Sequence, residues 1–190
     1  HIGKNGRFIN VEIRVVNGSR LVMGDNCIFD ASERHLNYIN VEDNSKMSLK
    51  NNVRIQGDVL VRFGGEFTMG IYSSINWGSE IRCDERVSIG DYCLMSYEVC
   101  IYDTNTHTTD WQERRAIIPN RAQDVKRPPT KPVYIGNDVW IGKGVTILKG
   151  TVIGDTCIIG IRTVVPSGYY PEGSVIVSPT PVFLVTYFLV

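Results

Sequence analysis

Isoleucine recurs at every sixth position between residues 133 and 160, namely at Ile135, Ile141, Ile147, Ile153 and Ile159. A small or aliphatic residue stands two places before each of them, and glycine follows four of the five. Six is not a multiple of the 3.6 residues in a helical turn, but it fits a strand, whose side chains alternate with a period of two. The pattern therefore predicts short strands, each with two inward-facing residues, joined by tight corners.

The same pattern extends back through most of the chain. The earlier aliphatic positions are Val15, Met23, Phe29, Val41, Leu49, Ile55, Val61, Met69, Ile75, Ile81, Ile89, Met95 and Ile101. Glycine, aspartate and asparagine follow many of them and suit corners that need a positive φ. Three strands would form one triangular coil, and stacked coils would share one core, as in solenoids. The sequence thus predicts an all-β parallel solenoid.

Irregular steps in the repeat predict one long loop at a defined corner. The step lengthens to eight residues at 41→49, 61→69 and 81→89, which places a small bulge at the same corner of successive coils. The large step from Ile101 to Ile135 leaves from that corner. We therefore expect one domain over residues 1–181 with a loop over about 102–132 that projects from the prism. Such loops in compact folds are usually functional.

Composition and charge narrow the possible functions. Twenty basic and twenty acidic residues cancel, so the chain has no electrostatic footprint for nucleic acid. The five cysteines form no CxxC pair and suit a reducing compartment as small buried residues. The apolar tail over 182–190 is too short to cross a bilayer. With no signal peptide recognised, we expect a cytoplasmic protein without a transmembrane segment.

The six-residue pattern resembles the hexapeptide-repeat acyltransferases, whose fold is a left-handed parallel β-helix. The handedness comes from the family, because parallel crossovers are usually right-handed. The segment from Ile75 to Val165 is similar to the galactoside and maltose O-acetyltransferase branch and its relatives in surface-polysaccharide gene clusters. The resemblance implies transfer of an acetyl group from acetyl-CoA to a saccharide hydroxyl, with no metal. It also implies a homotrimer with active sites between subunits.

The resemblance points to His107 as the catalytic base. The family's catalytic histidine sits where a long loop leaves the helix, and His107 lies at the mouth of the predicted loop, whereas His1 is terminal and His35 lies in a separate insertion. Imidazole can accept a proton from the acceptor hydroxyl and pass it to the departing thiolate. Because the thioester is already activated, no covalent enzyme intermediate is required.

The group that orients His107 stays open at this point. Asp103, Asn105 and Asp110 are all near it in the sequence, and a backbone carbonyl would serve equally well. For the acceptor, Asn76 and Asp84 resemble the family's sugar-binding asparagine and aspartate, although Asn76 is also suited to a simple corner.

Stacked glycines indicate the donor site. With eighteen residues per coil in this region, Gly142 lies under Gly160, and the pair leaves a groove that a ligand can approach closely. The resemblance implies that the pantetheine arm follows this groove. The alternative is that these are only turn glycines and that the nearby charges, including Lys149, form a solvated face. The implied cofactor-binding residues are Trp140, Gly142, Lys143, Gly160, Ile161 and Arg162.

The chain departs from the family at its end. A basic residue that meets the CoA 3′-phosphate is often found after a Gly-x-Pro-Ala stretch, and Pro181 stands in that place here. Three other functions are weighed against O-acetylation. They are N-acetylation of a nucleotide-linked amino sugar, a zinc carbonic anhydrase, which needs about three histidine ligands, and a non-enzymatic scaffold. The loop with His107 argues against the scaffold.

Overall fold

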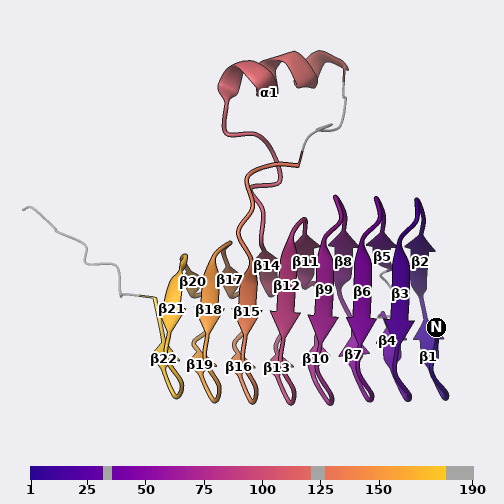
Figure 1. Cartoon of the computed structure of the whole chain (residues 1–190). Coiled ribbons are helices and arrows are strands. Elements are labelled where there is room, and N and C mark those ends of the chain that lie inside the picture. The colour runs from indigo at the N-terminus through magenta and orange to yellow at the C-terminus, as the bar shows by residue number, and fades with distance from the viewer. Residues whose placement is uncertain (32–35, 121–126, 179–190) are drawn as a thin grey trace, which may run out of the picture.

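The computed structural model describes residues 1–31, 36–120 and 127–178. Its strands form three parallel sheets, and each strand is followed by a strand of the next sheet (Figure 1). The first sheet contains β1 (Arg7–Ile9), β4 (Ile28–Asp30), β7 (Arg54–Ile55), β10 (Ser74–Ile75), β13 (Leu94–Met95), β16 (Trp140–Ile141), β19 (Ile158–Ile159) and β22 (Val175–Ile176).

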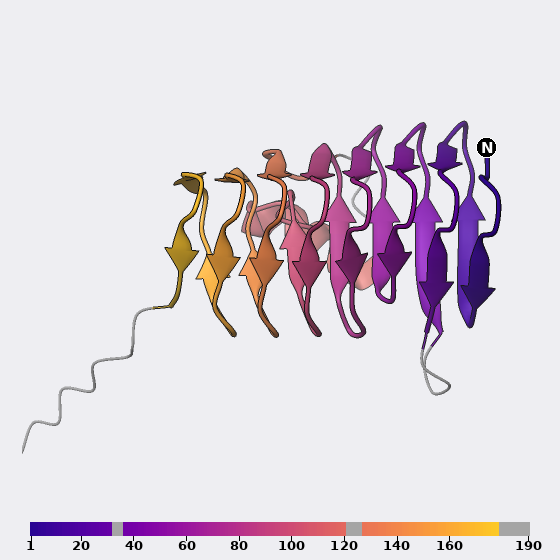
Figure 2. The same ribbon diagram turned by 90° about the horizontal axis from the view of Figure 1, so that it is seen from below.

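The other two sheets complete the coils. The second sheet contains β2 (Val11–Val15), β5 (Asn37–Val41), β8 (Asp58–Val61), β11 (Glu80–Cys83), β14 (Cys100–Tyr102), β17 (Thr146–Ile147) and β20 (Val164–Val165). The third contains β3 (Arg20–Met23), β6 (Lys46–Leu49), β9 (Glu66–Met69), β12 (Arg86–Ile89), β15 (Val133–Ile135), β18 (Thr151–Ile153) and β21 (Gly168–Tyr170). The view from below shows the stacked coils of one continuous prism (Figure 2). The predicted all-β parallel solenoid is confirmed.

The repeating aliphatic residues fill the interior of the prism. Ile141 and Ile147 are fully buried, as are their partners two places earlier, Val139 and Val145. Burying one such side chain contributes about 1.5–3 kcal/mol, so each coil adds several units of this size. Val15 is the exception, with 38% of its surface exposed, because it lies in the first coil and is covered on one side only.

The corner between the third and first sheets shows what the six-residue period demands of the backbone. Asn5, Asn26 and Asn52 occupy it on successive coils with φ of 58°, 57° and 62°, and their side chains hydrogen-bond from coil to coil. Tyr72 and Tyr92 hold the same conformation on the next coils, and their rings stack 5.5 Å apart. Asparagine adopts positive φ at low cost, whereas stacking offsets that cost for tyrosine.

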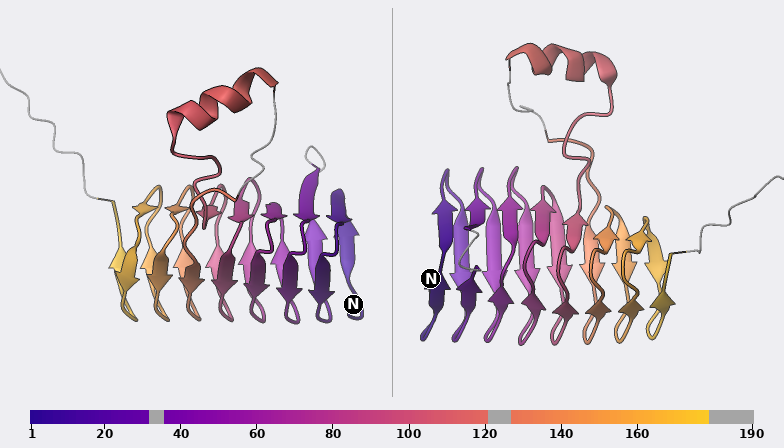
Figure 3. Two further views of the ribbon diagram at one scale, coloured as in Figure 1. Left: turned by 45° about the horizontal axis from the view of Figure 1, so that its top comes forward. Right: turned by 180° about the vertical axis from the view of Figure 1, so that it is seen from behind.

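The long loop leaves the corner between the second and third sheets, as predicted, and stands away from the prism as an arm (Figures 1 and 3). It carries a helix that the sequence pattern did not indicate, α1 (Trp111–Ile117), followed by a 3-10 turn (Ile118–Asn120). The side chain of Asp110 accepts from the backbone amides of Gln112 and Glu113 and so caps the helix. No residue of α1 is buried.

Pro181, the tail over 182–190, His35 and residues 121–126 of the arm lie outside the described residues. Within the described ranges, no helix combines the length and apolar character needed to cross a membrane.

Candidate active site

Asp103 fastens the base of the arm to the prism. Its carboxylate is fully buried and accepts from the backbone amides of Asp84, Glu85 and Arg86 at 2.8, 2.8 and 2.7 Å. Burial raises the pKa of this carboxyl group, and the three amide donors oppose that rise. These three hydrogen bonds tie Asp103 to the corner backbone, so it positions the base of the arm; that it also orients His107 directly stays a prediction.

The two ends of the arm are joined just above Asp103. The backbone amide of Lys131 donates to the carbonyl of Asp103 at 2.8 Å, and that of Asn105 donates to the carbonyl of Pro129 at 3.1 Å. Thr104 and Thr130 form an antiparallel bridge between them. His107 follows this closed base by only a few residues, so its position is set by the arm's attachment.

His107 borders a groove of about 310 Å³ on the outer face of the second sheet. The preceding residue, Thr106, takes a left-handed conformation with φ of 63°, and its amide donates to the hydroxyl of Thr104 at 3.0 Å. Thr106 and His107 line this groove together with residues of strands β2, β5, β8 and β11. The residues that line the groove are Arg14, Asn40, Glu42, Leu60, Arg62, Arg82, Thr106 and His107.

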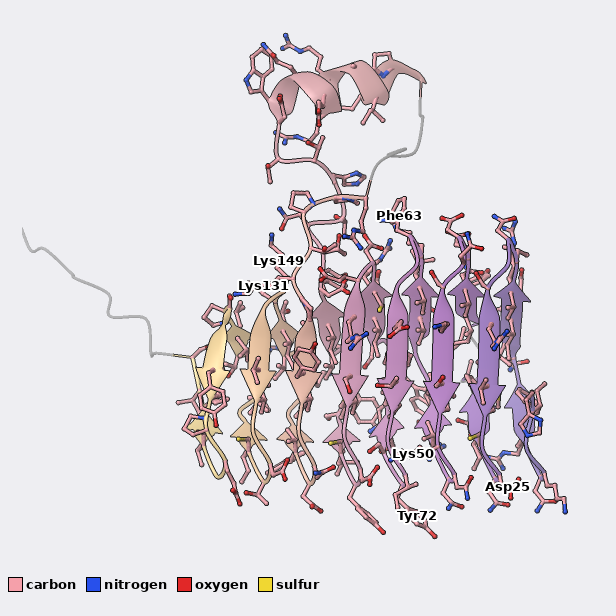
Figure 4. All side chains as sticks on the ribbon, viewed as in Figure 1. Asp25, Lys50, Phe63, Tyr72, Lys131 and Lys149 are labelled. Atoms are coloured by element: carbon pink, nitrogen blue, oxygen red, sulfur yellow. The ribbon has the colours of Figure 1, made fainter. Side chains whose placement is uncertain are left out.

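Asp84 reaches this groove only through Arg62. The Asp84 side chain is fully buried, and its oxygens accept from Nε and Nη2 of Arg62 at 2.8 and 3.3 Å. The guanidinium of Arg62 also lies 4.8 Å from the ring centroid of Phe63, at the edge beside the arm (Figure 4). Within this chain the Asp84 carboxylate is shielded from solvent behind Arg62, and its direct contact with the acceptor stays a prediction. Its role is to position Arg62.

Asn76 lies at a different edge of the prism. It follows β10 at the corner between the first and second sheets, is half-buried, and is not among the residues that line the groove beside His107. One chain alone does not bring Asn76 and His107 together.

Gly142 and Gly160 are stacked on successive coils, as predicted, but different atoms surround the two glycines. A Cβ on Gly142 would lie 2.8 Å from the backbone nitrogen of Ile161, so close packing of the coils excludes a side chain there. A Cβ on Gly160 would first meet the Val177 side chain, at 2.9 Å. Packing thus explains Gly142 without a ligand, as the alternative interpretation held, whereas Gly160 borders a surface that a side chain would fill.

The other predicted cofactor residues surround this pair. Trp140 is 52% exposed on the outer face of the first sheet, and Ile161 is 70% exposed at the corner. Lys143 pairs with Glu98, with 3.0 Å between Nζ and Oε1, and Arg162 is exposed in a left-handed conformation with φ of 54°. These residues lie between the first and second sheets, whereas the arm leaves between the second and third. Within one chain, the width of the second sheet separates the cofactor residues from the base of the arm.

Several charged residues near the arm escaped the sequence reasoning. Arg14 and Arg82 each stand one place from an inward aliphatic residue, so strand alternation alone would have placed them on the outer face of the second sheet. Lys131 also escaped it; it is labelled near the base of the arm in Figure 4, as is Lys149, which the sequence had already suggested as part of a charged face, and Nζ of Lys131 donates to the hydroxyl of Ser167 at 3.4 Å. In the ranges that the structure describes, no three histidine, cysteine, aspartate or glutamate side chains gather as a metal site would require.

Comparisons with known proteins agree with this architecture. Residues 132–166 match the family model described as bacterial transferase hexapeptide (six repeats). No curated protein matches the chain. Among solved structures, the polySia-specific acetyltransferase NeuO shares 22% identity and a TM-score of 0.68, over 90% of this chain and 73% of its own.

Two further solved structures are similar in the same way. The polysialic acid O-acetyltransferase OatWY shares 22% identity with a TM-score of 0.55, over 98% of this chain and 94% of its own. A hexapeptide-repeat-containing acetyltransferase from Vibrio cholerae shares 24% identity with a TM-score of 0.51, over 64% of this chain and 62% of its own. The chain therefore has the left-handed β-helix fold of these proteins, and its residues 132–166 match the bacterial transferase hexapeptide model.

Proposed function

We propose that this protein transfers an acetyl group from acetyl-CoA to a hydroxyl group of a saccharide, with His107 as the general base. The observation that carries the proposal is the placement of His107, which a fastened arm holds at a polar groove on a hexapeptide-repeat prism. The names of NeuO and OatWY, which refer to acetylation of polysialic acid, support a saccharide as the acceptor.

The reaction needs one general base and a binding site that holds the acceptor hydroxyl next to the thioester. A hydroxyl group is a weak nucleophile, and the imidazole of His107 would take its proton as the oxygen attacks the thioester carbonyl. A new carbon–oxygen bond forms as the carbon–sulfur bond breaks, and the proton passes from imidazolium to the departing sulfur. Asn105, two residues before His107, remains the proposed orienting residue, and Asn76 a proposed acceptor contact. Acetyl-CoA as donor favours the cytoplasm as the location.

We further propose a homotrimer with active sites between chains. Three observations support it. The arm carries Trp111 and Ile118 with 57% and 71% of their surfaces exposed, which leaves apolar area for a neighbour to cover. Leu94, Trp140 and Ile158 form an exposed apolar row across β13, β16 and β19. Finally, one chain separates the arm that carries His107 from the cofactor residues, which a neighbouring chain would reunite.

Mixing two inactive variants should restore activity if the site is shared. His107→Ala removes the base, and Gly160→Trp should block the donor groove, since the Cβ of the new side chain would be tight only against the Val177 side chain. After co-refolding in equal amounts, about a quarter of the sites in a closed trimer would pair an intact base with an intact groove. Turnover should then recover to about that fraction of the wild-type rate.

Each variant refolded alone serves as the control. It should sediment as a trimer and show no acetyl transfer. Mixed trimers without recovered activity, or a fully active monomer, would contradict the shared site.

Thiol release tests the function itself. The protein is incubated with acetyl-CoA and a panel of neutral, acidic and amino sugars, and free CoA thiol is followed. Saccharide-dependent release is expected with sugars that offer only hydroxyl groups. Release confined to free amino sugars would favour N-acetylation, and no release with any sugar would refute the proposal.

A further inference from the structure

A row of outward side chains crosses the second sheet directly beside His107. Strand pairing places Arg14 on β2 opposite Asn40 on β5, then Leu60 on β8, then Arg82 on β11. Neighbouring strands lie about 4.8 Å apart, so the Cα atoms of the two arginines are about 14 Å apart. Their long side chains can therefore converge on a group that lies over Asn40 and Leu60. All four residues line the groove that His107 borders.

The three arginines of the groove differ in how far their donors are occupied. Arg62 gives two nitrogens to the buried carboxylate of Asp84. Arg82 gives Nε to Glu80 on its own strand, which leaves its terminal nitrogens for another partner. The side chain of Arg14 makes no hydrogen bond or ion pair with any residue in the described ranges. As far as the described residues go, the groove thus presents one guanidinium with all its donors available and a second with part of them.

The charge changes sign along the groove. The next hollow on the same face shares Asn40, Leu60 and Arg82 with the groove, and continues to Asp58 and Glu80. An anion would be attracted at the end beside His107 and repelled at the far end. Among the residues that the structure describes, Glu42 is the one acidic residue lining the end beside His107. These charges favour a single position for an anionic group, next to Arg14.

We propose that the acceptor is an acidic saccharide and that Arg14, assisted by Arg82, binds its carboxylate or phosphate group so that a hydroxyl meets His107. The planar guanidinium offers paired donors that match either oxyanion in a bidentate contact. Anchoring the charge at a fixed distance from His107 would select which hydroxyl is presented. This inference deepens the proposed function and rests on it.

Three variants test the role of charge at this position. Arg14→Gln removes the guanidinium and should weaken the binding of acidic acceptors about 10–100-fold, the contribution of a charge-assisted hydrogen bond. Glu42→Gln removes the opposing negative charge and should strengthen the binding of the same acceptors. Arg20→Gln is the matched control, since Arg20 begins β3 on the third sheet, is exposed and forms no ion pair with a described residue. It should change nothing.

Binding and turnover are measured with matched probes. Oligosaccharides of sialic, glucuronic and galacturonic acid are compared with their carboxyl-reduced forms, and a phosphorylated oligosaccharide with its dephosphorylated form. Calorimetry uses the assembled protein with and without His107→Ala, so that binding is read independently of acetyl transfer. At least one acid should bind more tightly than its neutral form, and Arg14→Gln should abolish that preference. The acid whose affinity most exceeds that of its neutral form shows whether the site prefers a carboxylate or a phosphate group.

Two results would overturn the inference. One is equal binding of every acid and its neutral form, and the other is a preference that survives Arg14→Gln. The proposed function can fail separately: if acids bind through Arg14 but no saccharide is acetylated, the anion site stands and the reaction does not. If wild type and Arg14→Gln acetylate neutral sugars at equal rates, the reaction stands and the anion site does not.

Discussion

Replacing His107 with alanine is expected to lower turnover by about 10²–10⁴-fold, the usual contribution of a general base. His107 is exposed at the arm and lies outside the buried core, so its removal should leave the melting temperature unchanged. The acetyl-CoA affinity should also change little, because the cofactor residues lie at another corner of the prism. Steady-state kinetics with saturating donor, together with calorimetric titration of CoA, measure both effects.

His107→Asn is a useful companion, because it keeps a hydrogen-bonding side chain but cannot act as a base. It should be as slow as the alanine variant. Turnover within a few-fold of wild type in either variant would remove His107 from the proton transfer.

Replacing Asp103 with alanine is expected to give the second-largest loss, about 100-fold in turnover. Three backbone amides of the corner would lose their acceptor, and each unpaired buried group costs about 1–3 kcal/mol. The base of the arm would then loosen, and His107 would no longer be held at the groove. Because Asp103 acts through His107, turnover should fall while the acetyl-CoA affinity remains.

A double-mutant cycle separates positioning from a general loss of stability. If Asp103 only holds His107 in place, adding Asp103→Ala to His107→Ala should cost almost no further turnover. Asp110→Ala is the matched control, because it removes the α1 cap from the same arm but leaves its base intact. Its turnover should stay near wild type. Fully additive losses in the cycle would contradict the positioning role.

The repeat predicted the fold because a single period constrains every coil. Once Ile135 and Ile141 face inward, every sixth residue must face inward too, and the eight-residue steps place the arm at its corner. The helix α1 was missed because seven residues without a buried face carry no periodic signal. The hydrogen-bond partners of Asp103 and Asp84 could not be predicted, because the corner amides and Arg62 come together with them only in the folded coils.

Acetyl transfer to a saccharide hydroxyl can be observed directly with acetyl-CoA labelled with ¹³C at the acetyl carbonyl. With an acceptor selected by thiol release, carbon NMR should show one new acetyl ester on the saccharide for each thiol released, at a rate that His107→Ala lowers at least 100-fold, within the range for a general base. An acetamide signal, thiol release without a labelled saccharide, or equal rates for wild type and His107→Ala would contradict O-acetylation by this site.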